Sequence, residues 1–293
     1  MTTDVPVAPS FDDKATAANA LASSLRTPSS RSDLSAIARA YDVGLGGKDH
    51  PDRIAFEKLL KIEPRLPVAM SENRAFLGRA VMAASLLDIK QFLNLGSGLP
   101  SPDGISVTDV ARRYHPDARI VHVDVAELVA VYGRALLARD DNVLVVHEDA
   151  RDPDRMLKQA AELLDLEEPA CIIATAVAHF WADSDDPAGV LRHYMRAFPA
   201  GYLILSHACG EEMSPDDFAQ LRATYEEAFA SIYPRTRAQI VTFLDGLEPL
   251  EPGLVEASQW RNDDRQIDVG KAYFLAAVAG FGLYAQKPAR SAA

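Results

Sequence analysis

From residue 89 onward, the sequence alternates between short apolar runs and stretches with helical periodicity. Five runs have the length of a β-strand and are rich in Val, Ile and Leu, namely KQFLNL, RIVHVDV, NVLVVHED, ACIIATAV and YLILSHA. Helical spacing is found between them, over residues 105–114, 126–138, 153–165 and 187–198. Strands that are apolar along their whole length must be covered on both faces, and alternating strands and helices build parallel sheets. The pattern therefore predicts an α/β fold: a mostly parallel sheet with helices on both faces.

The segments that flank this alternating core have a different composition. Residues 1–32 are rich in Ala, Ser, Thr and Pro, which predicts a flexible N-terminal arm. Residues 33–88 have helical spacing interrupted at the glycines of GLGGKD, so we expect a helical cover or substrate gate there. The core then spans residues 89–293. Within it, a helix is expected over residues 214–231, and the closing run KAYFLAAVAGFGLYAQK predicts a final pair of strands.

Composition limits the classes of function and the location. The net charge of −12 argues against general affinity for nucleic acid, because no basic surplus exists to neutralise phosphates. No apolar run reaches the ~20 residues needed to span a bilayer. The start, MTTDVPVAPSFDDK, lacks a basic segment followed by an apolar stretch, so we expect a cytoplasmic protein. Cys171 and Cys209 lie in apolar runs and are expected to be buried thiols, without a disulfide or a metal site.

Glycines and acids follow three successive strands of the predicted sheet. Gly96 and Gly98 follow the first strand, and glycine lets the backbone approach a ligand closely because it has no Cβ. Asp124 ends the second strand, where a carboxylate can accept hydrogen bonds from ribose hydroxyls. Asp149 could accept from an adenine amino group, while the N–H of Ala150 could donate to a ring nitrogen. Either acid alone could merely cap a helix, but together the three strand ends predict a nucleoside site.

The segment after the glycine loop distinguishes between nucleoside cofactors. A dinucleotide site requires GxGxxG and a helix N-terminus that is free to meet the pyrophosphate. Here the third glycine is absent, and LPSPDG places two prolines and an acid before the next helix. A positively charged nucleoside without phosphate fits this segment better, and S-adenosylmethionine is such a molecule.

Several motifs together resemble one actinobacterial family of class I S-adenosylmethionine-dependent methyltransferases, long catalogued as a domain of unknown function. They are ARAYDVGLGGKDH, SENRAFLGRAV, QFLNLGSGLP, VHVDVAE, HEDARDP, HFWADSDDPAGVL and YLILSHA. The similarity covers roughly residues 33–287, and the YD..LGGKD signature is specific to the family. The resemblance implies a Rossmann-like, seven-stranded sheet whose last strand is antiparallel, with S-adenosyl-L-methionine as the cofactor.

The resemblance also implies which residues bind the cofactor. The glycine loop contacts the methionine part, the end of the second strand holds the ribose and flanks the adenine, and the end of the third strand faces the adenine edge. The YD..LGGKD segment covers the pocket. Arg74 could reach the methionine carboxylate, because a guanidinium is a permanent cation with a planar fork of donors. The expected cofactor-binding residues are Tyr41, Gly47, Lys48, Arg74, Asn94, Gly96, Ser97, Gly98, Asp124, Val125, Asp149, Ala150, Arg151 and Ala176.

Two positions depart from the family pattern. Asn94 stands where many class I methyltransferases carry an acid near the ammonium group of the cofactor. An amide oxygen can still accept that hydrogen bond, but without a formal charge, so we expect weaker binding and not its loss. VDVAE replaces an acidic, VDND-like stretch. This change keeps Asp124 but makes the adenine side more apolar.

Two histidines are candidate general bases. His179, Trp181 and Asp183 match the His-x-Trp-x-Asp pattern of small-molecule O-methyltransferases, and an imidazole can take the proton of a phenol near neutral pH. His207, at the end of the fifth strand, is the alternative base. Either ring could instead only shape the pocket. The acidic run DSDDP is expected to be a solvated turn, so no metal site is predicted.

The leading hypothesis is an S-adenosylmethionine-dependent methyltransferase that acts on a small molecule. The acceptor would be an oxygen, nitrogen or carbon nucleophile, and catalysis would rest on proximity and orientation. One alternative is a protein that binds the cofactor without transferring its methyl group, as a sensor or in another reaction. A weaker alternative is a nicotinamide-dependent reductase. No nucleic-acid or membrane partner is expected, and a homodimer remains open because the arm could pack on a neighbouring copy.

Overall fold

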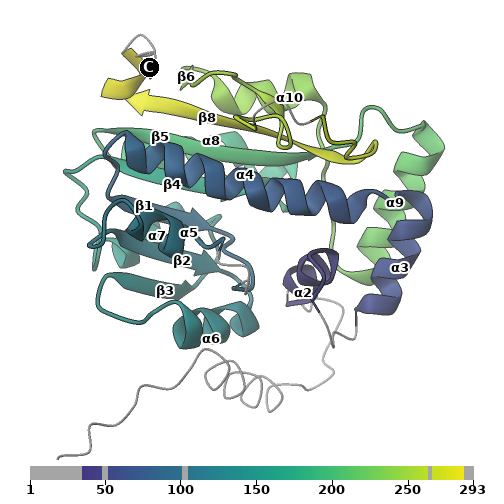
Figure 1. The fold of residues 1–293 in the computed structure, drawn as a ribbon, viewed down its shortest axis with the longest axis horizontal. Helices are drawn as coiled ribbons and strands as arrows, with labels where there is room; N and C mark the ends of the chain where they lie inside the picture. The colour runs from purple at the N-terminus through teal and green to yellow at the C-terminus, as the bar shows by residue number, and fades with distance from the viewer. Residues whose placement is uncertain (1–34, 48–51, 101–104, 263–265, 287–293) are drawn as a thin grey trace, which may run out of the picture.

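A mostly parallel sheet forms the centre of the computed structural model, which describes residues 35–47, 52–100, 105–262 and 266–286 (Figure 1). The predicted arm over residues 1–32 lies outside these ranges. The sheet has the strand order β3-β2-β1-β4-β5-β8-β6, and β7 also pairs with β8. The strands are β1 (Gln91–Leu95), β2 (Arg119–Asp124), β3 (Val143–His147), β4 (Ala170–Thr175), β5 (Ala200–Cys209), β6 (Glu248–Pro249), β7 (Val255–Glu256) and β8 (Tyr273–Gly282).

The first five strands are parallel, and β8 runs antiparallel to β5 along its whole length. The predicted fold class is therefore confirmed, including the antiparallel last strand. The described residues form eight strands where seven were expected, because the two-residue β7 pairs with β8 beside the equally short β6.

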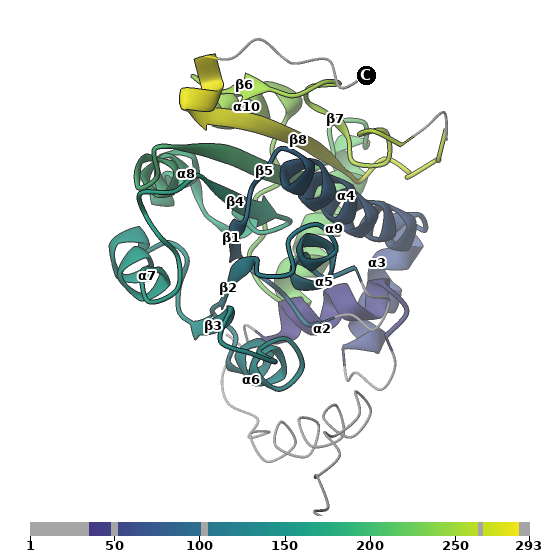
Figure 2. The same ribbon diagram turned by 60° about the vertical axis from the view of Figure 1, so that its left-hand side comes forward.

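Helices cover both faces of the sheet. Figure 2 shows α4 and α5 on one face and α7 and α8 on the other, while α6 packs on β2 and β3. The α-helices of the described chain are α2 (Ser35–Gly44), α3 (Arg53–Ile62), α4 (Leu66–Leu86), α5 (Val107–Arg112), α6 (Glu127–Leu136), α7 (Pro153–Ala160), α8 (Pro187–Arg196), α9 (Pro215–Ala228) and α10 (Arg237–Val241). Short 3-10 helices are η1 (Ala178–Phe180), η2 (Asp183–Asp185), η3 (Thr242–Leu244) and η4 (Leu283–Gln286).

Three helices begin with the same local signal. The side chains of Asp152, Asp186 and Ser214 each accept a hydrogen bond from the backbone N–H three residues later, at the starts of α7, α8 and α9. A proline follows each of them. Proline is favoured at the first helical position, because its missing N–H has no partner within the helix there. These helix starts could therefore be predicted from sequence.

The end of the chain differs from the prediction. The run KAYFLAAVAGFGLYAQK was expected to form a pair of strands, but it forms the single strand β8, followed by η4. Every residue of β8 pairs with β5. The glycines lie too late in the run for a hairpin: Gly282 has φ +60° and ends the strand, and a Cβ on Gly280 would press on Tyr284 of η4. The prediction of a strand pair was therefore wrong.

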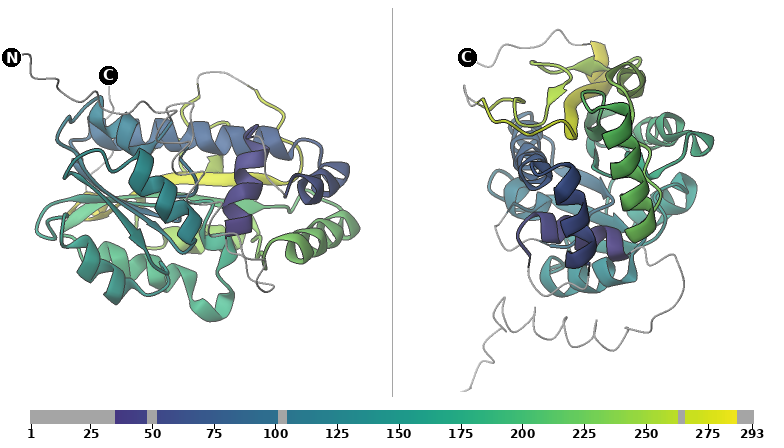
Figure 3. Two further views of the ribbon diagram at one scale, coloured as in Figure 1. Left: turned by 90° about the horizontal axis from the view of Figure 1, so that it is seen from below. Right: turned by 90° about the vertical axis from the view of Figure 1, so that its right-hand side faces the viewer.

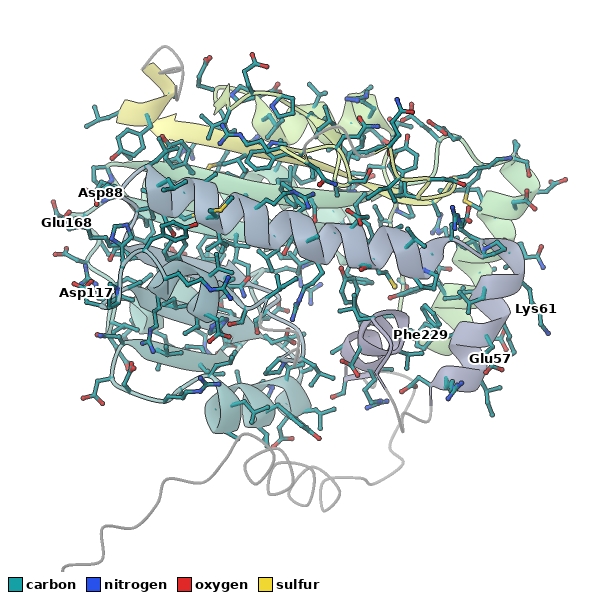
Figure 4. The ribbon with its side chains drawn as sticks, viewed as in Figure 1. Glu57, Lys61, Asp88, Asp117, Glu168 and Phe229 are labelled. Carbon is teal, nitrogen blue, oxygen red and sulfur yellow. The ribbon has the colours of Figure 1, made fainter. Side chains whose placement is uncertain are left out.

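The carboxyl ends of the parallel strands point toward α2 (Figure 1). Helix α2 contacts both α4 and α6 and so crosses this end of the sheet, while α3 packs beside α9 further out (Figure 3). Asp88, Asp117 and Glu168 precede strands and lie at the opposite end of the sheet (Figure 4). The two ends of the sheet therefore differ: α2 crosses one of them, and exposed acidic side chains lie at the other.

Both cysteines are free and buried, Cys171 in β4 and Cys209 in β5. In the ranges that the structure describes, no helix is both long and apolar enough to cross a membrane.

The centre of the sheet should dominate stability. Ile173 in β4 has no exposed surface, whereas Ile54 on α3 is 73% exposed. Ile173→Ala should lower the free energy of unfolding by about 2–5 kcal/mol, because it leaves a cavity in a packed core. The same change at Ile54 should stay within about 0.5 kcal/mol of wild type. Urea unfolding measures both values, and equal losses in the two variants would contradict this description of the core.

Candidate functional site

A cavity of about 470 Å³ lies at the carboxyl ends of the parallel strands, under α2. This volume is within the usual range for small-molecule sites, about 300–1,000 Å³. The lining comes from α2 and α4, from the segments that follow β1, β2, β3 and β4, and from residues 230–233. These strands include β1 and β4, which are adjacent and from which the chain departs to opposite sides of the sheet. In open α/β sheets, ligands bind at that point.

The loop after β1 requires both of its glycines. Gly96 has φ +65°, and a Cβ there would lie only 2.5 Å from Val177, so a side chain would disturb the neighbouring loop. Gly98 has the same φ, but a Cβ there would meet no atom within 4 Å. Gly98 lines the cavity. Its missing side chain therefore leaves open space beside the backbone, where a ligand can approach.

Asp124 is fixed at the end of β2 by backbone donors. Its carboxylate accepts hydrogen bonds from the N–H of Gly98 at 2.9 Å and from the N–H of Ala126 at 3.0 Å. Burial raises the pKa of Asp124, and these hydrogen bonds partly offset that effect. The carboxylate therefore joins the glycine loop to the start of α6 and presents a fixed acceptor at the cavity.

At the end of β3, Asp149 is paired with Arg151. The carboxylate of Asp149 accepts from the backbone N–H, Nε and Nη2 of Arg151, at 2.9, 3.0 and 2.6 Å. Arg151 also donates to Asp185 at 3.3 Å, and these three residues line the cavity. The pKa of Asp149 is lowered because the hydrogen bonds and charge of Arg151 outweigh the cost of burial. An adenine amino group would have to share this carboxylate with Arg151.

Arg74 brings a permanent positive charge to the cavity. It projects from α4 and lines the cavity, and its Nε is buried without a partner among the described residues. The Oδ1 of the adjacent Asn73 is likewise buried and unpartnered, while its Nδ2 donates to Tyr41 at 2.8 Å. Buried polar groups normally have a hydrogen-bond partner, so the Arg74 guanidinium is suited to bind an anionic group.

Close contacts explain why two positions of the YD..LGG segment are glycines. A Cβ on Gly44 would collide with Met70 of α4, and a Cβ on Gly47 would overlap the carboxylate of Asp42. Asp42 lines the cavity, whereas Gly47 does not. Gly47, predicted to bind the cofactor, thus supports the turn that holds Asp42. Lys48 lies outside the described residues.

The two predicted bases lie behind the cavity wall. His179 and His207 are 3% and 0% exposed, and neither is among the lining residues. Their rings pack edge to face with centroids 5.5 Å apart. Nδ1 of His179 accepts from the N–H of Ala208 at 3.3 Å, and Nδ1 of His207 lies 2.9 Å from the Ala208 carbonyl.

Arg235 holds this wall together, and sequence analysis did not identify it. Its guanidinium is buried and donates to the carbonyls of Ala178 and Trp181, to Asp183 at 2.7 Å and to Nε2 of His207 at 2.9 Å. These bonds join the loop after β4 to β5. Because Arg235 already fills the acceptor on His207, the ring must be neutral.

One side of the cavity is mainly apolar. Phe180 and Trp181 follow β4, Tyr233 follows α9, and Ile37 and Leu45 come from the α2 region. None of these residues was predicted as a site residue, except that Trp181 belonged to the His-x-Trp-x-Asp pattern. Their apolar character gives no signal that distinguishes them from core residues in the sequence.

Most of the predicted cofactor residues line this one cavity. Ala176, at the end of β4, has an unusual φ of +52° for a residue other than glycine, and its N–H donates to Ser206. Such backbone strain clusters at functional sites. The predicted residues on the lining are Tyr41, Arg74, Asn94, Gly96, Ser97, Gly98, Asp124, Val125, Asp149, Ala150, Arg151 and Ala176.

The sequence profile of the S-adenosyl methyltransferase family matches residues 26–285. The chain belongs to this family. A DUF574 family protein from Streptomyces avermitilis is 32% identical, with a TM-score of 0.76 over 83% of this chain and 95% of that one. A Thermobifida fusca protein proposed to be a methyltransferase is also 32% identical, with a TM-score of 0.76 over 83% and 93% of the two chains. Among curated proteins, no relative matches.

The comparisons confirm the predicted family and cofactor: the protein is an S-adenosylmethionine-dependent methyltransferase. The cavity fits this cofactor, because a fixed carboxylate, a guanidinium whose Nε has no partner among the described residues, and a side-chain-free backbone lie around one space. A pyrophosphate fits poorly. The N-terminus of α5, next to the glycine loop, is already capped by Ser106 and carries Asp109 in its first turn.

The buried histidines should make the methyltransferase sensitive to acid. Burial lowers the pKa of His122 from 6.5 to about 4 and that of His207 to about 3, with a further contribution from nearby arginines. Below pH 6.5 the unfolded chain therefore binds more protons than the folded protein. The stability that the neutral rings contribute is complete above pH 6.5 and is lost as the pH falls. Each ring should lower the free energy of unfolding by up to about 1.4 kcal/mol per pH unit.

Denaturant unfolding between pH 6.5 and 5 measures this slope. His207→Gln keeps an acceptor for Arg235 but removes the titrating ring. The free energy of unfolding should therefore depend less steeply on pH in this variant, by up to about 1.4 kcal/mol per pH unit. Thr224→Val, on α9, removes no titrating group, so it is the control and should keep the wild-type slope. The explanation fails if His207→Gln and wild type have the same slope.

Proposed function

We propose that the methyltransferase acts on a small molecule and transfers the methyl group to an oxygen, nitrogen or carbon nucleophile. The observation that carries the proposal is the cavity itself. Helix α2 crosses the end of the sheet, so the acceptor must fit beneath it, against Phe180, Trp181 and Tyr233. When bound, the cofactor supplies a methyl group on a positively charged sulfur.

Different polar residues of the cavity bind different parts of the cofactor. The Asp124 carboxylate accepts from the ribose hydroxyls, because the N–H groups of Gly98 and Ala126 hold it in place. Arg74 pairs with the carboxylate of the methionine part, since its buried Nε has no hydrogen-bond partner among the described residues. Val125 and Ala150 flank the adenine beside the Asp149–Arg151 pair.

The remaining lining orients the acceptor. Phe180, Trp181 and Tyr233 hold an apolar or aromatic body and exclude water, so catalysis rests on proximity and orientation. The role of His179 or His207 as a base requires a ring that reaches the cavity, and neither ring lines it. We assign both histidines a supporting role, in which they and Arg235 fix the loop that carries Phe180 and Trp181.

A labelling experiment tests the class of acceptor. The protein is incubated with S-adenosylmethionine labelled on the methyl group and with an actinobacterial extract that has been separated by molecular mass. Label should appear in the low-mass fraction, together with S-adenosylhomocysteine. Label in the protein or nucleic-acid fraction would contradict the proposal. Binding without label in any fraction would support the alternative, a protein that binds the cofactor but does not transfer the methyl group.

Asp124 should be essential for binding the cofactor. A hydrogen bond to a charged group contributes about 1.5–3 kcal/mol, so Asp124→Asn should weaken S-adenosylhomocysteine binding roughly tenfold or more. Asp88→Asn makes the same chemical change at the opposite end of the sheet, where the side chain is 77% exposed. Calorimetric titration compares the two variants. Equal affinities would show that Asp124 does not contact the ligand.

A further inference from the structure

A buried polar chain lies beneath Asn94, the residue that replaces the usual acid. Nδ2 of Asn94 is 3.1 Å from Nδ1 of His122, and Nε2 of His122 is 2.9 Å from Oγ1 of Thr108. The three side chains are 4%, 2% and 4% exposed. They come from β1, β2 and α5, so this row of hydrogen-bonded side chains connects the sheet to the helix that follows the glycine loop. Only Asn94 of the three lines the cavity.

The tautomer of the imidazole sets the direction of the amide. A neutral ring has one donor and one acceptor nitrogen. With Nε2–H donating to Thr108, Nδ1 is the acceptor and must face the amide nitrogen of Asn94. The amide oxygen is then directed away from His122. With the other tautomer, Nδ1–H would face the amide oxygen, and the amide nitrogen would be directed away.

The surroundings keep the ring neutral. Its pKa is lowered to about 4, first by burial and then by the positive charge of Arg74, with an opposing contribution from Asp109. A protonated ring would have two donors, and Nδ1 could then face only the amide oxygen. The neutral ring is therefore the form compatible with an outward-facing oxygen.

We propose that His122 and Thr108 are positioning residues that direct the Asn94 carbonyl oxygen into the cavity, where it accepts a hydrogen bond from the ammonium group of the cofactor. This inference rests on the proposed cofactor site. It explains how an uncharged residue does the work of the missing acid: the buried chain determines which end of the amide meets the ligand. An unsupported asparagine would present its NH₂ group equally well, and that group would repel an ammonium.

The test compares two ligands that differ only in the ammonium group, S-adenosylhomocysteine and its desamino analogue, by calorimetric titration. Wild type should prefer S-adenosylhomocysteine by about tenfold to a hundredfold, the size of one hydrogen bond to a charged group. Thr108→Val keeps the shape of the side chain and removes the acceptor for Nε2–H. In this variant the preference should fall to about threefold or less, with the affinity for the analogue unchanged. Thr224→Val, on the distant α9, is the matched control.

Asn94→Asp in the Thr108→Val background provides the rescue. A carboxylate has two acceptor oxygens, so it needs no tautomer to direct it, and the preference for the ammonium ligand should return.

Nitrogen-15 NMR of the free protein gives an independent readout. The His122 signals should show the Nε2–H tautomer in wild type and a shift toward Nδ1–H in Thr108→Val.

The outcomes separate this inference from the proposed function. Equal weakening of both ligands in Thr108→Val, an unchanged preference, or an Nδ1–H tautomer in wild type would overturn the positioning role. If wild type binds neither ligand, the proposed cofactor site fails and the ammonium contact fails with it. The His122 tautomer, measured without ligand, still shows in that case whether His122 and Thr108 orient Asn94.

Discussion

The parallel pairing of β1 with β2 on one side and β4 on the other is the constraint on which the site depends. Residues 92–94 of β1 pair with both neighbours, and the chain leaves β1 and β4 toward opposite edges of the sheet. No crossover helix therefore fills the space above their carboxyl ends. The backbone of the glycine loop and the Asp124 carboxylate border this space, and α2 covers it.

Buried polar groups maintain the shape of this opening. Arg235 connects the loop after β4 to His207, and His122 connects Asn94 to Thr108. The connection through Arg235 requires a neutral His207 imidazole, because its Nε2 accepts from the guanidinium. A buried polar group without its partner costs roughly 1–3 kcal/mol, so each connection specifies one arrangement of the wall and disfavours the others. The geometry of the cavity is thus coupled to the stability of the fold.

The sequence predicted the parts of the structure that follow from local rules. Apolar runs specify strands, Asp-Pro and Ser-Pro specify helix starts, and the ends of parallel strands must meet, which brings Gly98, Asp124 and Ala150 to one cavity. Arg235 could not be predicted, because its partners are separated from it by 28 to 57 residues and no motif marks it. His122 did leave a signal: it is a polar residue inside the apolar run RIVHVDV, and a buried polar residue needs partners. The position of His179 at a strand end did not reveal that its ring faces the interior.

A crystal structure of the protein with S-adenosylhomocysteine would test the central claim most directly. We predict that the ligand occupies the cavity under α2, with its ribose hydroxyls on Asp124, its carboxylate on Arg74 and its ammonium group on the oxygen of Asn94. A ligand bound at another place, or in this cavity with its ribose away from Asp124, would contradict the assignment of the cofactor site.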